Sequence, residues 1–378
     1  MSIINSFEDL NLSDELLRGI YSYGWEIPSI VQQKGITPVI EGKDSIIQAQ
    51  SGTGKTGTFS ISVLHRINVK IISCQAIILS PTREIALQSS NVIKKLGAYI
   101  KNINISTVIG GINLINEIVL KSHIVVGTPG RVKDMIGRGY INMSKLCLFV
   151  LDESDQMLNI GFKEQIIDIL EYIPPKCQIA IYSATMPMSI IELADRFMKN
   201  PTKILVKKEQ LTLDGISQFH IACSSEQEKF NILCDIYHTL KIAQSIIYCV
   251  TKRKVEWLST QLENSDFPVS RIHSNMTQTE RQDIIKNFRS GINRILITTD
   301  LLARGVDFPQ VSLVINYDLP NTKQNYIHRI GRTGRYGKKG VAINLIVSDK
   351  DHKYMKELEE FYKTEITEMP QNIQNYIS

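Results

Sequence analysis

The sequence predicts an α/β protein of two domains, each with a mostly parallel sheet flanked by helices. Short β-rich runs alternate with helix-length amphipathic segments from about residue 40 to the C-terminus, which is the pattern of parallel α/β sheets. A chain of 378 residues is too long for one ordinary hydrophobic core, so its length favours two domains, or three. A Pro, a charged stretch and a Gly within residues 200–215 separate two sets of strands.

Strand candidates are distributed evenly over the two halves. In the first half they lie near residues 44, 76, 105, 123, 146 and 178, and in the second half near residues 218, 244, 269, 294, 311 and 341. The segment from 200 to 215 is interpreted as a last strand followed by a short linker. We therefore expect an N-terminal domain of residues 1–208 and a C-terminal domain of residues 209–378, joined by a hinge.

Composition narrows the class of protein. Hydrophobic residues make up 43% and charged residues 21%, which is typical of a folded soluble chain, and the net charge of +5 permits an anionic partner. No apolar run approaches the roughly 20 residues of a membrane span, and the acidic start is unlike a targeting peptide. The six cysteines contain no CxxC pair, which predicts a reducing compartment and no zinc site.

A phosphate-binding loop is predicted directly after the first strand candidate. AQSGTGKT, residues 49–56, matches the phosphate-loop pattern with Ala49 in place of the usual first Gly. Its glycines let backbone amides surround phosphate oxygens, Lys55 brings a positive charge to the β and γ positions, and Thr56 can hold Mg²⁺. An ordinary Gly-rich turn is the alternative, but the strand before the loop and the helix after it favour phosphate binding.

Two carboxylates end a second apolar run. FVLDESDQML begins at Phe149 and delivers Asp152 and Glu153 at the end of a predicted buried strand. In phosphate-loop enzymes an Asp at this position joins the loop Ser/Thr in holding Mg²⁺, and the neighbouring Glu153 is placed to orient or deprotonate an attacking water. Considered alone, the stretch would be a solvated acidic turn, whereas together with the loop it predicts a magnesium–nucleotide site.

Basic residues and glycines gather near the C-terminus. YIHRIGRTGRYGKKG contains His328, Arg329, Arg332 and Arg335. Such a stretch is most often a solvated loop or a nucleic-acid patch. Phosphoryl transfer, however, needs cations on the γ-phosphate, and arginine fingers on a second domain would make hydrolysis depend on closure of the hinge.

The chain resembles a DEAD-box RNA helicase over nearly its whole length. The motifs that carry this resemblance follow the family's order: GWEIPSIVQ, AQSGTGKT, PTREIALQ, the pair Gly110-Gly111, TPGR, DESD, SAT, QTER, TTDLLARGVD and HRIGRTGR. The resemblance implies two RecA-like domains and an ATP-dependent RNA helicase that hydrolyses ATP with Mg²⁺. The family has Ala where this chain has Ser154. Within the family, VKKEQLTLDGISQFH and EITEMPQNI are most similar to the translation-initiation branch.

The resemblance also implies roles in nucleotide binding and hydrolysis. Gln32 would read the edges of adenine and Trp25 would stack on its face, although Trp25 could equally belong to the core. The nucleotide would be bound by Trp25, Gln32, Ser51, Gly52, Thr53, Gly54, Lys55, Thr56 and Asp307, and Mg²⁺ by Thr56 and Asp152, partly through water. The catalytic set would be Lys55, Asp152, Glu153, His328, Arg332 and Arg335. The two domains would be coupled by Asp155, Ser183, Thr185 and Arg304.

RNA would be bound without sequence preference, as a single strand or a short duplex. The residues that the resemblance assigns to RNA are Pro81, Thr82, Arg83, Gly110, Gly111, Thr128, Gly130, Arg131, Gln278, Arg281 and Thr299. Glycines allow close backbone approach, and Thr, Arg and helix N-termini contact phosphate or sugar and not bases. Contacts to 2′-hydroxyls would distinguish RNA from DNA. Any one of these residues taken alone is better interpreted as part of a turn or a solvated surface.

The leading hypothesis is a cytoplasmic, monomeric helicase that remodels RNA in translation initiation, with a HEAT-repeat scaffold protein as partner and no membrane association. Frequent Ile, Asn and Lys suggest an AT-rich genome, which can be a genome of reduced size. The cytosol or the nucleus of a compartment with such a genome therefore stays open as the location. An ATP-locked RNA clamp at the core of a splicing-linked ribonucleoprotein complex is the alternative, because it would use nearly the same motifs. A DNA helicase is a weaker third candidate.

Overall fold

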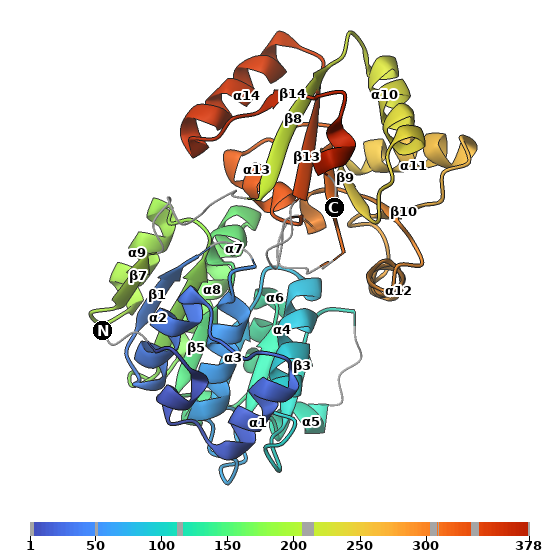
Figure 1. The fold of residues 1–378 in the computed structure, drawn as a ribbon. Helices are drawn as coiled ribbons and strands as arrows, with labels where there is room; N and C mark the ends of the chain where they lie inside the picture. Colours follow the sequence, from blue (N-terminus) through green and yellow to red (C-terminus); the bar gives the residue numbers. More distant parts are fainter. Residues whose placement is uncertain are drawn as a thin grey trace. The chain divides into compact units, whose positions relative to one another are not determined.

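The chain forms two compact units, Met1–Leu211 and Thr212–Ser378 (Figure 1). The structure is a computed structural model and describes residues 4–49, 52–111, 116–205, 215–302, 308, 310–333 and 340–376. The predicted boundary between residues 208 and 209 lies outside the described residues.

The first unit is built on a seven-stranded sheet with the order β3-β4-β2-β5-β6-β1-β7. All of its strand pairs are parallel. The strands are β1 (Ser45–Gln48), β2 (Ala76–Leu79), β3 (Ile105–Val108), β4 (Ile124–Gly127), β5 (Leu148–Leu151), β6 (Gln178–Ser183) and β7 (Thr202–Leu205). Fully buried β-branched and aliphatic runs such as AIIL and LFVL form these strands because a parallel sheet is covered on both faces.

Helices cover both faces of this sheet and enclose a hydrophobic core on each side. They are α1 (Asp14–Ser22), α2 (Ile30–Ile40), α3 (Lys55–Arg66), α4 (Arg83–Leu96), α5 (Asn116–Leu120), α6 (Pro129–Gly137), α7 (Ser154–Ile160), α8 (Lys163–Tyr172) and α9 (Met188–Phe197), with short 3₁₀ helices η1 (Phe7–Leu10) and η2 (Met143–Lys145). Leu148 and Val150 of β5 pack into one core, whereas Phe149 and Leu151 pack into the other. This alternation follows from the period of two along a strand.

The second unit repeats the architecture with the order β10-β11-β9-β12-β13-β8-β14, again with parallel pairs. Its strands are β8 (Ile216–Ala222), β9 (Ser245–Tyr248), β10 (Val269–Ile272), β11 (Ile295–Thr298), β12 (Leu313–Asn316), β13 (Gly340–Ile346) and β14 (Thr367–Glu368). Its helices are α10 (Glu226–Thr239), α11 (Lys252–Asn264), α12 (Gln278–Arg289), α13 (Lys323–Ile330) and α14 (Asp349–Tyr362), with η4 (Asp300–Leu302) and η5 (Ile373–Tyr376).

Hydroxyl side chains fix where several of the functional helices begin. Thr82, Thr277 and Thr322 each accept a hydrogen bond from a backbone N–H in the first turn of α4, α12 and α13, respectively. These N-caps satisfy donors that would otherwise lack partners, so they stabilise the helix starts. Residues directly after a cap, such as Arg83 and Gln278, are thereby held at the end of a strand–helix connection.

The predicted fold class is confirmed. Each strand candidate of the sequence corresponds to a strand, and the last strand expected after residue 200 is β7. The sequence does not signal β14, which has only two residues and pairs with β8. None of the helices in the described part of the chain combines the length and the apolar character that a membrane crossing requires.

Candidate functional site

Apart from Trp25 and Gln32, which precede β1, the predicted site residues of the first unit follow strands of one sheet, at the same edge. Because all pairs are parallel, the segments after the strands emerge at the carboxyl edge, where α/β sheets bind ligands. The phosphate loop, DESD and SAT follow β1, β5 and β6, which are neighbours in the sheet. The predicted RNA residues follow β3, β4 and β2, which form the other half of the same sheet.

The phosphate loop lies between β1 and α3. Gly54 is the N-cap of α3 at φ 110°, a left-handed conformation that glycine adopts without strain. Lys55 is 4% exposed, and its Nζ donates to the backbone carbonyl of Ala49 at 2.8 Å. The lysine therefore bends back across the loop. Gly52, Thr53 and Thr56 are described within this segment, whereas Ser51 lies outside the described residues.

Trp25 and Gln32 meet the first turn of α3. A Cβ on Gly57 would lie 2.4 Å from Gln32 Nε2 and 2.7 Å from the Trp25 ring, so only glycine leaves room for both side chains. Trp25 is half-buried and packs against the hydrophobic core beside the Tyr23 ring, with 4.8 Å between the ring centroids. Trp25 therefore contacts both the core and the loop helix, and its stacking on adenine stays a prediction.

Ser29 is a residue that sequence reasoning missed. Its Oγ donates to the backbone carbonyl of Thr53 at 2.8 Å, which ties α2 to the phosphate loop. Its backbone N–H donates to Gln32 Oε1 at 2.8 Å, so Ser29 and Gln32 form a capping box. The Ser-x-x-Gln pattern is the signal that could have revealed this contact.

Asp152 and Glu153 lie between β5 and α7. The backbone N–H of Asp152 donates to the Leu79 carbonyl of the neighbouring strand at 2.9 Å. Glu153 has φ 50° and ψ 48°, an uncommon left-handed conformation for a glutamate and a kind of strain that gathers at functional sites. Glu153 Oε1 lies 3.2 Å from Lys55 Nζ, and both side chains are 4% exposed. The loop lysine and the candidate base are therefore in direct contact.

This acidic pair fits a divalent cation. Burial, reinforced by the adjacent Glu153 carboxylate, raises the pKa of Asp152 to about 8. A buried carboxylate that resists ionisation gains most from a nearby positive charge, and oxygen ligands are those that Mg²⁺ prefers. The chemistry of the pair therefore suits the Mg²⁺ predicted for Asp152 and Thr56.

The residues predicted for interdomain coupling are joined within the first unit. Thr185 Oγ1 donates to Asp155 Oδ2 at 2.8 Å, and Ser183 Oγ donates to the Thr185 carbonyl at 2.6 Å. Ser154 is 2% exposed, and its Oγ donates to the Tyr182 carbonyl at 3.3 Å. One side-chain hydrogen bond thus joins the DESD and SAT segments, and a second joins DESD to Tyr182, the residue before SAT.

The predicted RNA residues of the first unit surround the ends of β2, β3 and β4. Arg83 lies against Gly110, because a Cβ there would be 2.9 Å from an Arg83 guanidinium nitrogen. Gly111 has φ 80°, in the region that favours glycine. Arg131 forms an ion pair with Asp134 at 2.6 Å on α6. Pro81 and Thr82 lie between β2 and α4, Thr128 lies between β4 and α6, and Gly130 lies in the first turn of α6.

The second unit contributes a smaller set of RNA candidates after β10 and β11, which are neighbours at one side of its sheet. Arg281 donates to Gln278 Oε1 at 2.7 Å on the first turn of α12. Thr299 follows β11 directly, and its Oγ1 accepts from the Leu301 N–H at 3.5 Å. The three residues therefore lie at one side of the carboxyl edge of this sheet.

The helix α13 carries His328 and leads to Arg332, whose Nε donates to the His328 carbonyl at 3.1 Å. Arg329, to which the sequence assigned no role, is fully buried and donates through Nε to Asp300 Oδ1 at 2.5 Å. It therefore belongs to the framework of the unit. Arg304, Asp307 and Arg335 lie outside the described residues.

The sequence matches known families in both units. Residues 29–193 match the DEAD/DEAH box helicase family, and residues 228–337 match the helicase conserved C-terminal domain. The chain is 53% identical to "Eukaryotic initiation factor 4A" of Drosophila melanogaster over 378 residues, covering 99% of this chain and 93% of the relative. It is 52% identical to "ATP-dependent RNA helicase eIF4A" of Chaetomium globosum over 377 residues, with 99% and 94% covered.

Solved structures agree with this assignment. Dbp5 of S. cerevisiae, bound to RNA and ADP BeF3, is 34% identical with a TM-score of 0.92, covering 98% of this chain and 97% of that one. Mss116p bound to ssRNA and AMP-PNP is 29% identical with a TM-score of 0.87, covering 97% and 79%. The chain belongs to the DEAD-box helicase family. Within that family, the relatives most similar to it include the initiation factor 4A proteins.

Proposed function

We propose that the chain is an ATP-dependent RNA helicase of the initiation factor 4A kind, which hydrolyses ATP when RNA is bound and unwinds short duplexes locally. The observation that carries this proposal is that two groups of residues, suited to two different ligands, share the carboxyl edge of the first unit's sheet. Residues suited to a magnesium nucleotide follow β1, β5 and β6, and residues suited to an RNA backbone follow β2, β3 and β4. Two ligands bound along one edge can influence each other through the segments that lie between them.

The first unit holds the nucleotide. Gln32 reads adenine, Trp25 stacks on it, and Gly52, Thr53, Gly54 and Ser51 surround the phosphates with backbone amides. Lys55 offsets phosphate charge, and Glu153 orients or accepts a proton from the attacking water. Asp152 and Thr56 would hold Mg²⁺, which supplies neutralisation of the phosphate charge. The Lys55–Glu153 contact supports this assignment, because it joins the phosphate ligand to the base.

The second unit completes hydrolysis. Arg332 and Arg335 stabilise charge on the transferred phosphoryl group, Asp307 binds the ribose, and Arg304 helps to hold the attacking water. His328 and Asp155 make hydrolysis respond to bound RNA. Gln278, Arg281 and Thr299 continue the RNA surface. The position of His328 and Arg332 at the end of one helix supports a shared role.

ATP hydrolysis with and without RNA tests this function. We expect uncapped single-stranded RNA of arbitrary sequence to stimulate hydrolysis about tenfold or more, and matched DNA to stimulate it much less because 2′-hydroxyl contacts are lost. Equal hydrolysis with and without RNA would refute the coupling. Equal stimulation by RNA and DNA would instead favour the DNA helicase.

A role in translation initiation is the most economical cellular assignment, since the relatives named above are initiation factors. We propose a cytoplasmic monomer with a HEAT-repeat scaffold protein as partner. The clamp is less favoured, because the most similar relatives named above are initiation factor 4A proteins. Affinity purification of the protein from the native cell distinguishes the two roles. Recovery of translation scaffolds supports the initiation role, whereas recovery of splicing-linked partners with retained RNA supports the clamp.

A further inference from the structure

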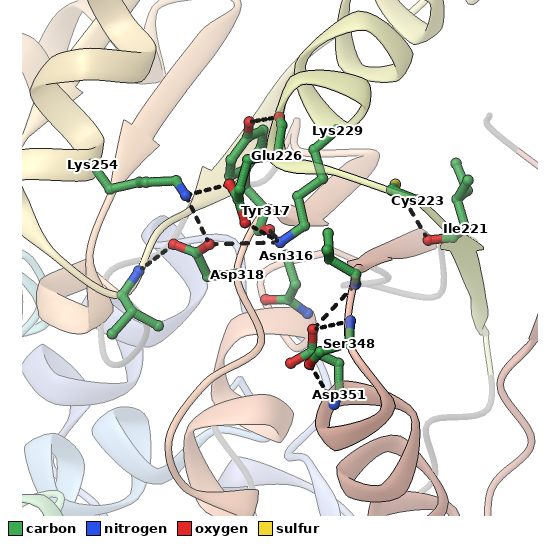
Figure 2. A network of polar contacts seen from close by, with 12 residues as sticks. Ile221, Cys223, Glu226, Lys229, Lys254, Asn316, Tyr317, Asp318, Ser348 and Asp351 are labelled. Atoms are coloured by element: carbon green, nitrogen blue, oxygen red, sulfur yellow. Dashed lines mark hydrogen bonds and ion pairs between the residues drawn. The ribbon is translucent and has the colours of Figure 1, made fainter.

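Lys229 is a buried lysine outside every motif used above. It lies on α10 and is 4% exposed. Its Nζ donates to the backbone carbonyl of Tyr317 at 3.0 Å and lies 3.3 Å from Glu226 Oε1 and 3.8 Å from Asp318 Oδ1 (Figure 2). Burying an ammonium group is costly, and such groups can be retained because they specify a geometry.

The Tyr317–Asp318 turn, directly after β12, is the object that Lys229 fixes. Asp318 Oδ2 accepts from the Val250 N–H at 3.1 Å, and the Asp318 N–H donates to the Tyr248 carbonyl at 3.2 Å. Lys254 approaches the same carboxylate from α11, with 3.7 Å between Nζ and Oδ1 (Figure 2). The turn is therefore connected to α10, to α11 and to the end of β9.

Arg329 of α13 binds the same turn. Its Nη1 donates to the Asp318 carbonyl at 2.7 Å and to Asn316 Oδ1 at 3.1 Å. Lys229 and Arg329, both buried cations, thus bind the consecutive backbone carbonyls of Tyr317 and Asp318. A change in the position of this turn therefore changes the position of Arg329.

Arg329 neighbours His328 and precedes Arg332, whose Nε donates to the His328 carbonyl at 3.1 Å. We propose that Lys229 is a positioning residue, which holds α13 through the Tyr317–Asp318 turn so that Arg332 is aligned with the transferred phosphoryl group. This inference rests on the proposed finger role of Arg332. Small misplacements of a group that acts only in the transition state lower kcat more than they change substrate binding.

Lys229→Met tests the proposal, because methionine nearly preserves the volume while removing the charge and the donor. We expect kcat of RNA-stimulated ATP hydrolysis to fall about ten- to a hundredfold and KM for ATP to change less than about threefold. Lys229→Arg, which keeps the charge and the donors, should restore most of the activity. Lys254→Met is the matched control: Lys254 pairs with the same two carboxylates but is partly exposed, and its loss should lower kcat less than about threefold.

A double-mutant cycle separates positioning from general destabilisation. In an Arg332→Ala background, Lys229→Met should lower kcat by less than about twofold further, since the group that it positions is already absent. Independent, multiplicative losses would overturn the proposal, as would parent-like kcat in Lys229→Met or equal damage by Lys254→Met. Thermal melting of each variant shows whether it is folded. If Lys229→Met does not fold, Asp318→Asn is used in its place, and we expect the same selective loss of kcat.

Other outcomes test the proposed function independently of the role of Lys229. If the parent enzyme shows no stimulation by RNA, the helicase assignment is wrong. If Arg332→Ala retains stimulated hydrolysis, the finger role is wrong and the positioning role of Lys229 is overturned with it.

Discussion

The hydroxyl of Ser154 donates to the backbone carbonyl of Tyr182, with 3.3 Å between the two oxygens. This bond joins the first residue of α7 to β6, one residue before Ser183. Alanine, which the family has at this position, could not form it. The hydroxyl that replaces a methyl hydrogen is therefore both buried and paired, so the departure from DEAD to DESD carries little cost.

Replacing Ser154 should accordingly have a small effect. We expect Ser154→Ala to keep RNA-stimulated ATP hydrolysis within about threefold of the parent and to change the free energy of unfolding by about 1 kcal/mol or less, because a long neutral hydrogen bond contributes little. Steady-state hydrolysis and urea unfolding measure the two effects. An inactive Ser154→Ala protein would show that the hydroxyl has acquired a role in catalysis.

Replacing Glu153 should have a large effect. Glu153→Gln keeps the shape of the side chain but cannot accept a proton, so we expect stimulated kcat to fall by about 10² to 10⁴. ATP-dependent retention of RNA should persist, because binding does not need the base. Glu164→Gln, at an exposed position of α8, is the control and should match the parent. More than a tenth of the parent kcat in Glu153→Gln would exclude a general base at this position.

The hydrogen bond between Thr185 and Asp155 should affect how strongly RNA stimulates ATP hydrolysis. Thr185→Val preserves the branched shape and removes the donor to the Asp155 carboxylate. Hydrogen bonds to charged groups contribute about 1.5–3 kcal/mol, so we expect the ratio of hydrolysis with RNA to hydrolysis without it to fall about tenfold. Fluorescent-ATP titration should show an affinity within about threefold of the parent. An unchanged ratio would mean that this bond plays no part in coupling.

The buried Asp152 predicts a pH dependence of stability. Its pKa is about 8 in the folded state and 3.8 without burial, so between these values the folded state binds the extra proton. The stabilisation is complete below pH about 4 and is lost as pH rises to about 8. In metal-free buffer, the parent should therefore lose at least about 1 kcal/mol more of its free energy of unfolding than Asp152→Asn between pH 5.5 and 8.5.

Urea unfolding of the two proteins at both pH values measures this difference. Mg²⁺ with ADP should reduce it, because a cation favours the ionised carboxylate. Identical losses in parent and variant would show that the pKa of Asp152 is not raised.

Much of the fold could be predicted because parallel strands are buried on both faces and appear as continuous apolar runs. The runs at AIIL and LFVL became β2 and β5. The loop around Lys55 was recognisable because glycines, lysine and threonine must be close in sequence to surround phosphates. Two-residue β14 gives no such run, and it exists only because it pairs with β8.

The sequence by itself determined which residues carry chemistry: Lys55, Asp152, Glu153 and the arginines near the C-terminus stand in local patterns that phosphoryl transfer requires. Only the tertiary structure decided how they are held. Glu153 is held in a left-handed backbone conformation. Ser154 and Lys229 bind the backbone carbonyls of Tyr182 and Tyr317, which are far from them in sequence, and Arg329 binds the carbonyl of Asp318. Backbone carbonyls are the same in every residue, so the side chain that finds one is fixed by packing and leaves no pattern in the chain.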